Sequence, residues 1–145
     1  TIKVTPHSVN VIPGTCTFSL EIRDQSAEVM KRIENNLRQL LQDICKKYDV
    51  TATFEPTSYH DPAPMSEFVE ETIEEAVKEL GIDYTIIPSG AFHDSLIMTS
   101  VFPTGMIFVP SKDGISHSRY EYTAPEDIEN GCNVLLNTVL KLDKK

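Results

Sequence analysis

The apolar run GMIFVPS at residues 105–111 constrains the fold of this chain more than any other segment. Its apolar side chains follow one another without the alternation that is typical of a strand with one face in water. Such a run is typical of a strand buried on both faces, as in a parallel sheet that helices cover. Helical spacing of apolar residues is found on both sides of it, at 66–80 and 123–142. With a further short strand expected at 83–90, this half of the chain is predicted to be α/β.

The first part of the chain has a different pattern. Two strands are expected around a turn at Pro13 and Gly14, and an amphipathic helix is expected over 26–48. A third strand is expected at 50–56, so an antiparallel sheet with a covering helix, an α+β layer, is predicted. The polar stretch 57–65 contains two prolines that break it, and it is the expected linker.

The expected boundaries are residues 1–62 for the first domain and 63–145 for the second. Each half supplies only two or three strands, which is few for a sheet that is stable on its own. We therefore interpret the chain as two partial domains that belong to a larger protein.

Charge and composition exclude several classes of partner. The formal net charge is −9 and the pI is about 4.8, so the surface repels nucleic-acid phosphates, and no polybasic stretch favours anionic lipid. No apolar run approaches the ~18 residues that a membrane span needs, and the first residues lack the pattern of a signal peptide. Three widely spaced cysteines without a CxxC pair are expected to be reduced core thiols. These features predict a cytoplasmic protein that binds neither nucleic acid nor membrane.

Two histidines follow the expected strands of the second half in similar loops. His93 lies in IPSGAFHDS and His117 in VPSKDGISHS, each with proline, serine, glycine and histidine in that order. The carboxyl ends of parallel strands form the edge at which α/β sheets bind ligands, so the two imidazoles are expected at one crevice. A loop histidine taken singly is more often structural, and no HxH, HxxxH or HxD spacing identifies a metal. The residues alone support a binding site and a structural role equally.

Three segments resemble the M20 family of metal-dependent amidohydrolases. They are NVIPGTCTFSLEIRD, PSGAFHDS and TGMIFVPSKDGISHSRYEYTAPEDIENGCNVLL, and they follow the family's order over nearly the whole chain. The chain is most similar to the branch that contains β-alanine synthase, N-carbamoyl-L-amino-acid hydrolases and allantoate amidohydrolase. The resemblance implies that residues 1–62 are part of an antiparallel-sheet lid, which is the dimerisation domain. Residues 63–145 would then be the C-terminal part of an α/β metallohydrolase catalytic domain.

The resemblance also implies roles for four residues, and a fifth position departs from the family's pattern. His117 matches the final ligand of a two-metal site, and His93 matches a histidine that contacts the substrate near the scissile amide. Asn10 and Arg23 match an asparagine and an arginine that grip the substrate carboxylate. A guanidinium fork suits that task because it binds a carboxylate through two parallel N–H groups. Phe92 stands where the family commonly has glycine, and its bulk would narrow the substrate pocket.

In the complete enzyme that this resemblance implies, two divalent ions activate a water for attack on a linear amide. Zinc or manganese, and also cobalt or nickel, suit a site of histidines and carboxylates. The substrate would be a ureido acid, either an N-carbamoyl amino acid or allantoate, and the lid would form a homodimer. The family's HxD motif is absent from these 145 residues, so the chain alone is predicted to be inactive. The alternative is a non-catalytic dimerisation or interaction module derived from the family.

Other polar residues are expected to be structural. His7 and His60 are interpreted as surface histidines, and Glu121 as a structural residue or as a group that orients a metal ligand. The glutamate pairs at 70–71 and 74–75 are expected on a solvated helix face, and not as the family's catalytic pair.

Overall fold

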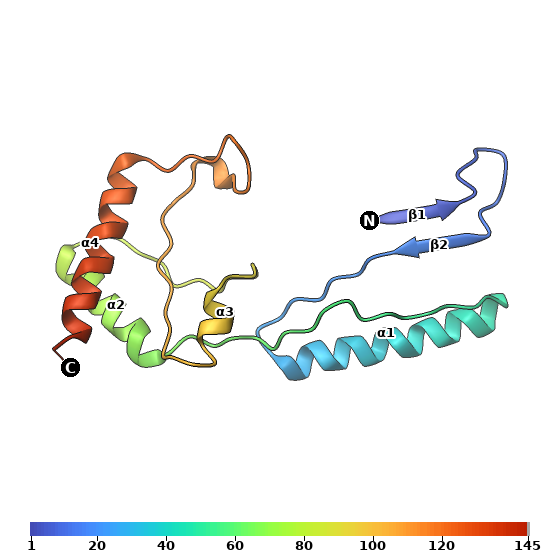
Figure 1. Cartoon of the computed structure of the whole chain (residues 1–145), viewed down its shortest axis with the longest axis horizontal. Helices are drawn as coiled ribbons and strands as arrows, with labels where there is room; N and C mark the ends of the chain where they lie inside the picture. The colour runs from blue at the N-terminus through green and yellow to red at the C-terminus, as the bar shows by residue number, and fades with distance from the viewer. Residues whose placement is uncertain (145) are drawn as a thin grey trace. The chain divides into compact units, whose positions relative to one another are not determined.

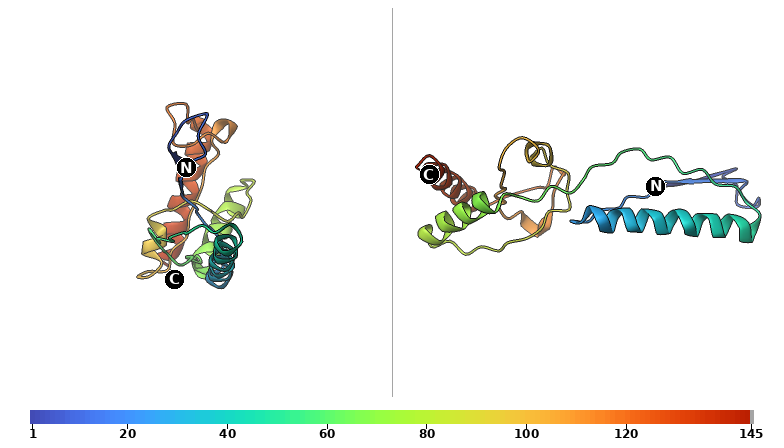
Figure 2. Two further views of the ribbon diagram at one scale, coloured as in Figure 1. Left: turned by 90° about the vertical axis from the view of Figure 1, so that its right-hand side faces the viewer. Right: turned by 90° about the horizontal axis from the view of Figure 1, so that it is seen from below.

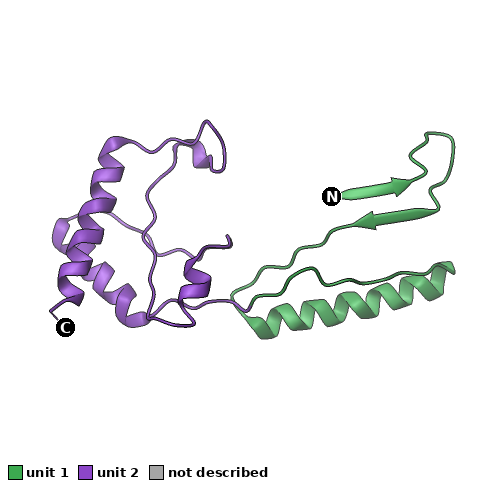
Figure 3. Cartoon of the chain, in the orientation of Figure 1, with its two compact units in different colours: residues 1–60 green, residues 61–145 purple. Residues whose placement is uncertain are grey.

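The computed structural model describes residues 1–144, which form two compact units. Unit 1 comprises Thr1–His60 and unit 2 comprises Asp61–Lys145 (Figure 3). Both units contain helices, and the only β-ladder among the described residues is a two-stranded antiparallel pair in unit 1. The fold is therefore a mixture of helices and one small antiparallel sheet. None of the described helices is long and apolar enough to cross a membrane.

Unit 1 begins with a β-hairpin. β1 (Ile2–Thr5) pairs antiparallel with β2 (Thr15–Phe18). The amide of Gly14 donates to the carbonyl of Thr5 at 2.9 Å and closes the connecting loop. The prediction of a strand directly before the turn is wrong, because that stretch forms the loop itself. Prolines stand at both ends of the stretch, and neither has the N–H that a ladder needs.

α1 is the long helix of unit 1 and spans Ala27–Tyr48, as the apolar periodicity predicts (Figure 1). The hydroxyl of Ser26 caps its first turn by accepting the amide of Val29 at 3.3 Å. Asp49 ends the helix in the left-handed conformation, with φ at 51°. None of the helix residues is fully buried, although apolar and polar side chains lie on separate faces. Its apolar face is therefore only partly covered.

Residues 50–56 run beside α1 as an irregular segment, and not as the strand that their alternation predicts (Figure 1). The guanidinium of Arg38 lies 3.8 Å from the centroid of the Phe54 ring. Glu34, one turn earlier on the helix, holds that guanidinium at 2.7 Å. The segment lies against a helix, which offers side chains and no free backbone groups, so a ladder cannot form there.

Unit 2 is organised around α2 (Glu67–Leu80) and α4 (Pro125–Leu142), which pack against each other (Figure 2). The buried residues of the described chain all lie on these two helices and are Thr72, Ala76, Val77, Val134 and Thr138. Both threonine hydroxyls donate to a carbonyl one turn earlier in their own helix, so burial leaves neither of them unpaired. At the rim of the contact, Lys141 donates to Glu79 at 2.6 Å.

The start of α4 differs from the prediction. The sequence predicts a capping box of Thr123 and Glu126, but Ala124 occupies the N-cap position. Pro125 takes the first helical position, where a missing N–H costs nothing, and this sets the helix start one residue later. The predicted end of α2 is confirmed, since Gly81 follows it with φ at 68°.

The two segments expected as buried strands, 83–90 and 105–111, belong to no β-ladder among the described residues. The second still lies close to a helix, because a Cβ added at Gly105 would come within 2.7 Å of Val69 on α2. A strand forms only where a neighbour pairs with its backbone, and this segment contacts helix side chains instead. The strand prediction is therefore wrong for both segments, although a helix does cover the second.

Two short helices follow these segments. α3 (Ser95–Met98) comes after the first, and the single 3₁₀ turn η1 (Lys112–Gly114) comes after the second. The hydroxyl of Ser95 donates to the sulfur of Met106 at 2.9 Å. The start of α3 is thus joined to the second segment.

The three cysteines are free, as predicted. Cys16 and Cys132 are exposed and Cys45 is half-buried, so the prediction of core thiols is wrong. The reason is that few apolar faces of the described chain are covered, as the short set of buried residues shows.

The contact of residue 105 with α2 can be tested with Gly105→Ala. The new methyl would meet side-chain methyl groups of Val69 at 2.7 Å and Ile73 at 3.0 Å, so these side chains must shift or the segment must move away from the helix. Overpacking of this kind costs about 1–3 kcal/mol, and we expect a lower urea midpoint by circular dichroism. Gly90→Ala is the matched control, because nothing lies within 4 Å of its added Cβ. Equal midpoints for the two variants would show that the contact is absent.

Candidate functional site

His93 lies in the loop that leads into α3 and is half-buried. Its Nε2 atom is 2.9 Å from the hydroxyl of Ser89, which also accepts the amide N–H of Ala91 at 3.2 Å. The imidazole meets the ring of Phe108 in a T-shaped contact, with centroids 5.5 Å apart and planes at 62°. The neighbouring Phe92 is exposed over 57% of its surface. The loop therefore holds the imidazole by one hydroxyl and one aromatic ring.

His117 lies in the loop after η1 and is exposed. Its φ of 53° is in the left-handed region, which residues other than glycine rarely adopt. Its amide N–H donates to Oε2 of Glu121 at 2.9 Å. Asp113 and Gly114, with φ of 57° and 66°, reverse the chain just before it. These contacts hold the backbone of His117 and leave its side chain in solvent.

Asn10 and Arg23 both lie in unit 1, outside its strands. Oδ1 of Asn10 accepts the hydroxyl of Ser8 at 2.6 Å. Arg23 donates through Nε and Nη2 to one oxygen of Glu21, at 2.9 and 2.6 Å. Both side chains of this ion pair are more than half exposed, so water screens it. The guanidinium thus already holds a carboxylate, and it does so at the surface.

The described residues do not complete a metal centre. No hydrogen bond or ring contact joins His93 to His117 within residues 1–144. In the same part of the chain, no three histidine, cysteine or acidic side chains gather where they could hold a metal ion. A protein site for zinc usually has three or four such ligands. The residues present therefore do not fit a metal by themselves, and His117 is a single candidate ligand.

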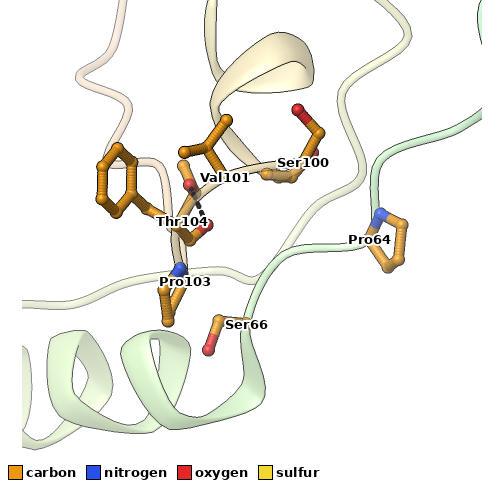
Figure 4. Close-up of a pocket in the computed structure, with 8 residues that line it drawn as sticks. Pro64, Ser66, Ser100, Val101, Pro103 and Thr104 are labelled. Carbon is orange, nitrogen blue, oxygen red and sulfur yellow. Dashed lines mark hydrogen bonds between the residues drawn. The ribbon is translucent and has the colours of Figure 1, made fainter.

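A hollow of about 400 Å³ in unit 2 also lacks residues that could bind a metal ion or act as a catalytic acid or base (Figure 4). It is lined by Pro64, Ser66 and residues 99–104. Most of its hydroxyls are occupied, since those of Thr99 and Ser100 donate to carbonyls of α3 and that of Thr104 donates to the backbone nearby. No lining residue is ionisable, so the hollow contains no acid, base or strong metal ligand.

Glu74 on α2 is held by contacts with a tyrosine and a lysine. Glu74 accepts the hydroxyl of Tyr84 and pairs with Lys78 at 2.9 Å. The Tyr84 hydrogen bond, and after it Lys78, hold the pKa of Glu74 below its ordinary value. The same hydrogen bond raises the pKa of Tyr84. A carboxylate held ionised in this way is a weak general base, and its contacts join α2 to the segment 83–90.

Two members of the candidate site are not predicted by the sequence pattern. Ser89 belongs to the Pro-Ser-Gly part of the loop and precedes His93 by four residues. This short separation in sequence is the only feature of the pattern that indicates their contact. Phe108 lies in the apolar run, where nothing in the spacing indicates a histidine partner. Glu121 was left between two interpretations, a structural residue or a group that orients a metal ligand, and its bond to the His117 amide is compatible with both.

The chain as a whole matches one known family of hydrolases. The sequence profile of peptidase family M20/M25/M40 matches residues 2–141. The chain therefore belongs to this family, and the resemblance drawn from its motifs is confirmed.

Relatives named as amidohydrolases are similar over the same length. The N-carbamoyl-L-amino acid amidohydrolase of Geobacillus stearothermophilus is 38% identical over 141 residues, which are 97% of this chain and 34% of the relative. The allantoate amidohydrolase of Bacillus subtilis (strain 168) is 33% identical, with the same coverage of 97% and 34%. A crystal structure of an amidase of the hydantoinase/carbamoylase family from Burkholderia multivorans is 35% identical, with a TM-score of 0.91 over 97% of this chain and 34% of that one. The chain thus spans about a third of the length of these relatives.

The loop that presents His117 can be tested through Glu121. In Glu121→Ala the amide of His117 loses its acceptor, and we expect its hydrogen exchange to accelerate roughly fivefold, since a bond of this kind contributes about 1 kcal/mol. Glu121→Gln keeps a carbonyl acceptor and should preserve most of the protection. The readout is residue-resolved amide exchange by NMR, and an unchanged rate in the alanine variant would mean that the bond does not form.

The Glu74 contact predicts a pH-dependent stability. Because the pKa of Glu74 is lowered in the folded chain, its contribution is present above the ordinary carboxyl pKa and is lost as the pH falls through the lowered value. Tyr84→Phe removes the largest cause, so we expect a lower melting temperature at neutral pH and no difference in strong acid. Tyr122→Phe, at another exposed tyrosine, is the control. A pH-independent difference would contradict the assignment.

Proposed function

We propose that this chain is the C-terminal part of a metal-dependent amidohydrolase that cleaves linear C–N bonds of N-carbamoyl amino acids or of allantoate. The match of residues 2–141 to one family carries the proposal, because the relatives similar over that same third include enzymes named for these substrates. The residues that we expect to act all lie in loops, where binding groups are commonly displayed.

Asn10 and Arg23 would bind the carboxylate of the substrate. Arg23 holds the carboxylate of Glu21 through two N–H groups, and a substrate carboxylate would take the place of that exposed partner. Oδ1 of Asn10 is occupied by the Ser8 hydroxyl, which leaves its amide NH2 group as the donor. Together these groups would orient the ureido end of the substrate.

His93 would contact the substrate near the scissile amide. The half-buried imidazole is held by Ser89 and Phe108, so it is already oriented before a substrate binds. The exposed ring of Phe92 would restrict the space beside it. A fixed N–H donor at this place stabilises the negative charge that develops on the carbonyl oxygen during attack.

His117 would contribute one ligand to a divalent metal ion. Zinc and manganese are the ions we expect, and cobalt or nickel also suit such a ligand. The remaining ligands and the general base would lie in the part of the enzyme beyond these 145 residues. We therefore propose that the isolated chain is inactive and binds no metal stoichiometrically.

A second candidate function is association without catalysis, as a homodimerisation module. The incompletely covered apolar face of α1 favours it, since Leu40 and Tyr48 are exposed over 54% and 62% of their surfaces. A second copy of the chain would cover such a face. Analytical ultracentrifugation of the purified chain tests this, because a monomer at all concentrations rules it out.

A chimeric enzyme tests the first proposal. Residues 2–141 of this chain replace the matching third of the Geobacillus stearothermophilus relative, and the product is assayed with N-carbamoyl amino acids and allantoate. We expect hydrolysis by the chimera and none by the 145-residue chain. Arg23→Lys in the chimera should raise KM about tenfold with little change in kcat, because one ammonium group cannot replace a two-pronged contact.

Arg32→Lys is the matched control, because this arginine lies exposed on α1 and has no assigned role. Its kinetics should equal those of the parent chimera. A chimera that is folded by circular dichroism but cleaves none of these substrates would contradict the proposed activity. Turnover by the 145-residue chain alone would contradict the proposal that essential groups lie outside it.

A further inference from the structure

One face of the segment 105–111 lies against the two long helices of unit 2. A Cβ added at Gly105 would come within 2.7 Å of Val69 on α2. Val109, four residues later, would lie 2.5 Å from a Cβ added at Gly131 on α4. Residues separated by an even number of positions share a face in an extended segment. Residues 105 and 109 therefore define the face that the helices cover.

The residues between them make contacts with other elements. The sulfur of Met106 receives the hydroxyl of Ser95 at 2.9 Å, and the ring of Phe108 meets the imidazole of His93. This alternation of contacts is that of a strand between two layers. The cover is only partial, since Phe108 and Val109 are exposed over 51% and 40% of their surfaces.

The backbone of the same segment has no partner. Within residues 1–144, no backbone hydrogen bond is formed by the amides of residues 105–109 or by the carbonyls of residues 105–110. The backbone groups of consecutive residues in a strand point to alternate edges, so both edges are open. An extended apolar segment with open edges is a template for the addition of strands.

We propose that strands from the rest of the amidohydrolase pair with the segment 105–111 at both of its edges. The argument for this occupant is length, because the chain spans about a third of the relatives that match it over 97% of its own residues. The larger part of such an enzyme is therefore available to supply the strands. The identity of this partner rests on the proposed function.

A second copy of the chain fits the segment less well. Two copies related by a two-fold axis would pair the segment with itself at one edge and leave the other edge open. Strands from the same enzyme can cover both edges at once. Such pairing would also act on the candidate site, because the segment contacts His93 through Phe108 and leads into the loop of His117.

Hydrogen exchange of the segment tests the pairing directly. Mass spectrometry would compare peptides that cover residues 105–111 in the 145-residue chain and in the chimeric enzyme. We expect fast exchange in the chain alone and exchange about a hundredfold slower or more in the chimera, because the amides of a central strand exchange only when the sheet opens. Residues 67–80 of α2 are the internal reference, since their amides are already bonded within the helix in the isolated chain.

A binding experiment tests the same pairing between separate chains. The 145-residue chain is mixed with the Geobacillus stearothermophilus relative from which the matching third has been removed, and analytical ultracentrifugation should detect a one-to-one complex. Ile107→Pro should weaken this complex about tenfold or more, because proline lacks the N–H that a ladder needs. Its helix content by circular dichroism should not change, since residue 107 lies outside the helices. Ser58→Pro, at an exposed position of the linker, is the matched control.

Equal exchange of the segment in the chain and in the folded chimera would overturn the proposal, and this result needs no variant. Exchange that slows when the 145-residue chain associates with itself would overturn the choice of occupant. Neither experiment depends on turnover. An inactive chimera with a protected segment would count against the proposed activity, and an active chimera with an unprotected segment would count against the pairing.

Discussion

The contact between α2 and α4 is the interaction on which the rest of unit 2 depends. Its buried side chains are alanine, valine and threonine, whose small size lets two helices approach closely. The same closeness extends to the neighbouring segment, because a Cβ on Gly105 or Gly131 would collide with a valine of the facing element. The segment therefore passes these helices so closely that a side chain at either glycine would force its neighbours to shift. Its far end leads into the loop of His117, so helix packing decides where that loop starts.

The candidate site residues are held by short polar contacts and not by burial. Ser89 holds the ring of His93, Glu121 holds the backbone of His117, and Glu21 holds the guanidinium of Arg23. Exposed contacts of this kind contribute little to stability. They do fix the orientation of the groups that they hold, and a ligand can displace them at a low cost in free energy. This combination suits residues that must be oriented before a substrate arrives and must then exchange partners.

The sequence predicted the helices better than the strands. α1 and α2 were placed well, because helix periodicity and end signals such as Gly81 are local. The segments 83–90 and 105–111 were not strands in the described chain, because a ladder depends on a partner elsewhere in the sequence. The family resemblance was sufficient to assign candidate roles to His117 and Arg23. It could not indicate the ring of Phe108 against His93, which depends on how two distant segments pack.

The sequence by itself determined the family, the three long amphipathic helices and the loops in which the histidines lie. These are properties of order and spacing along the chain, and they need no knowledge of what lies nearby in space. Only the tertiary structure decided which hydroxyl meets the imidazole of His93, which carboxylate meets the amide of His117, and which side chains are buried between α2 and α4. The reason is physical: a hydrogen bond or a packed side chain depends on separations of a few ångströms, and the chain sets those separations only when it folds.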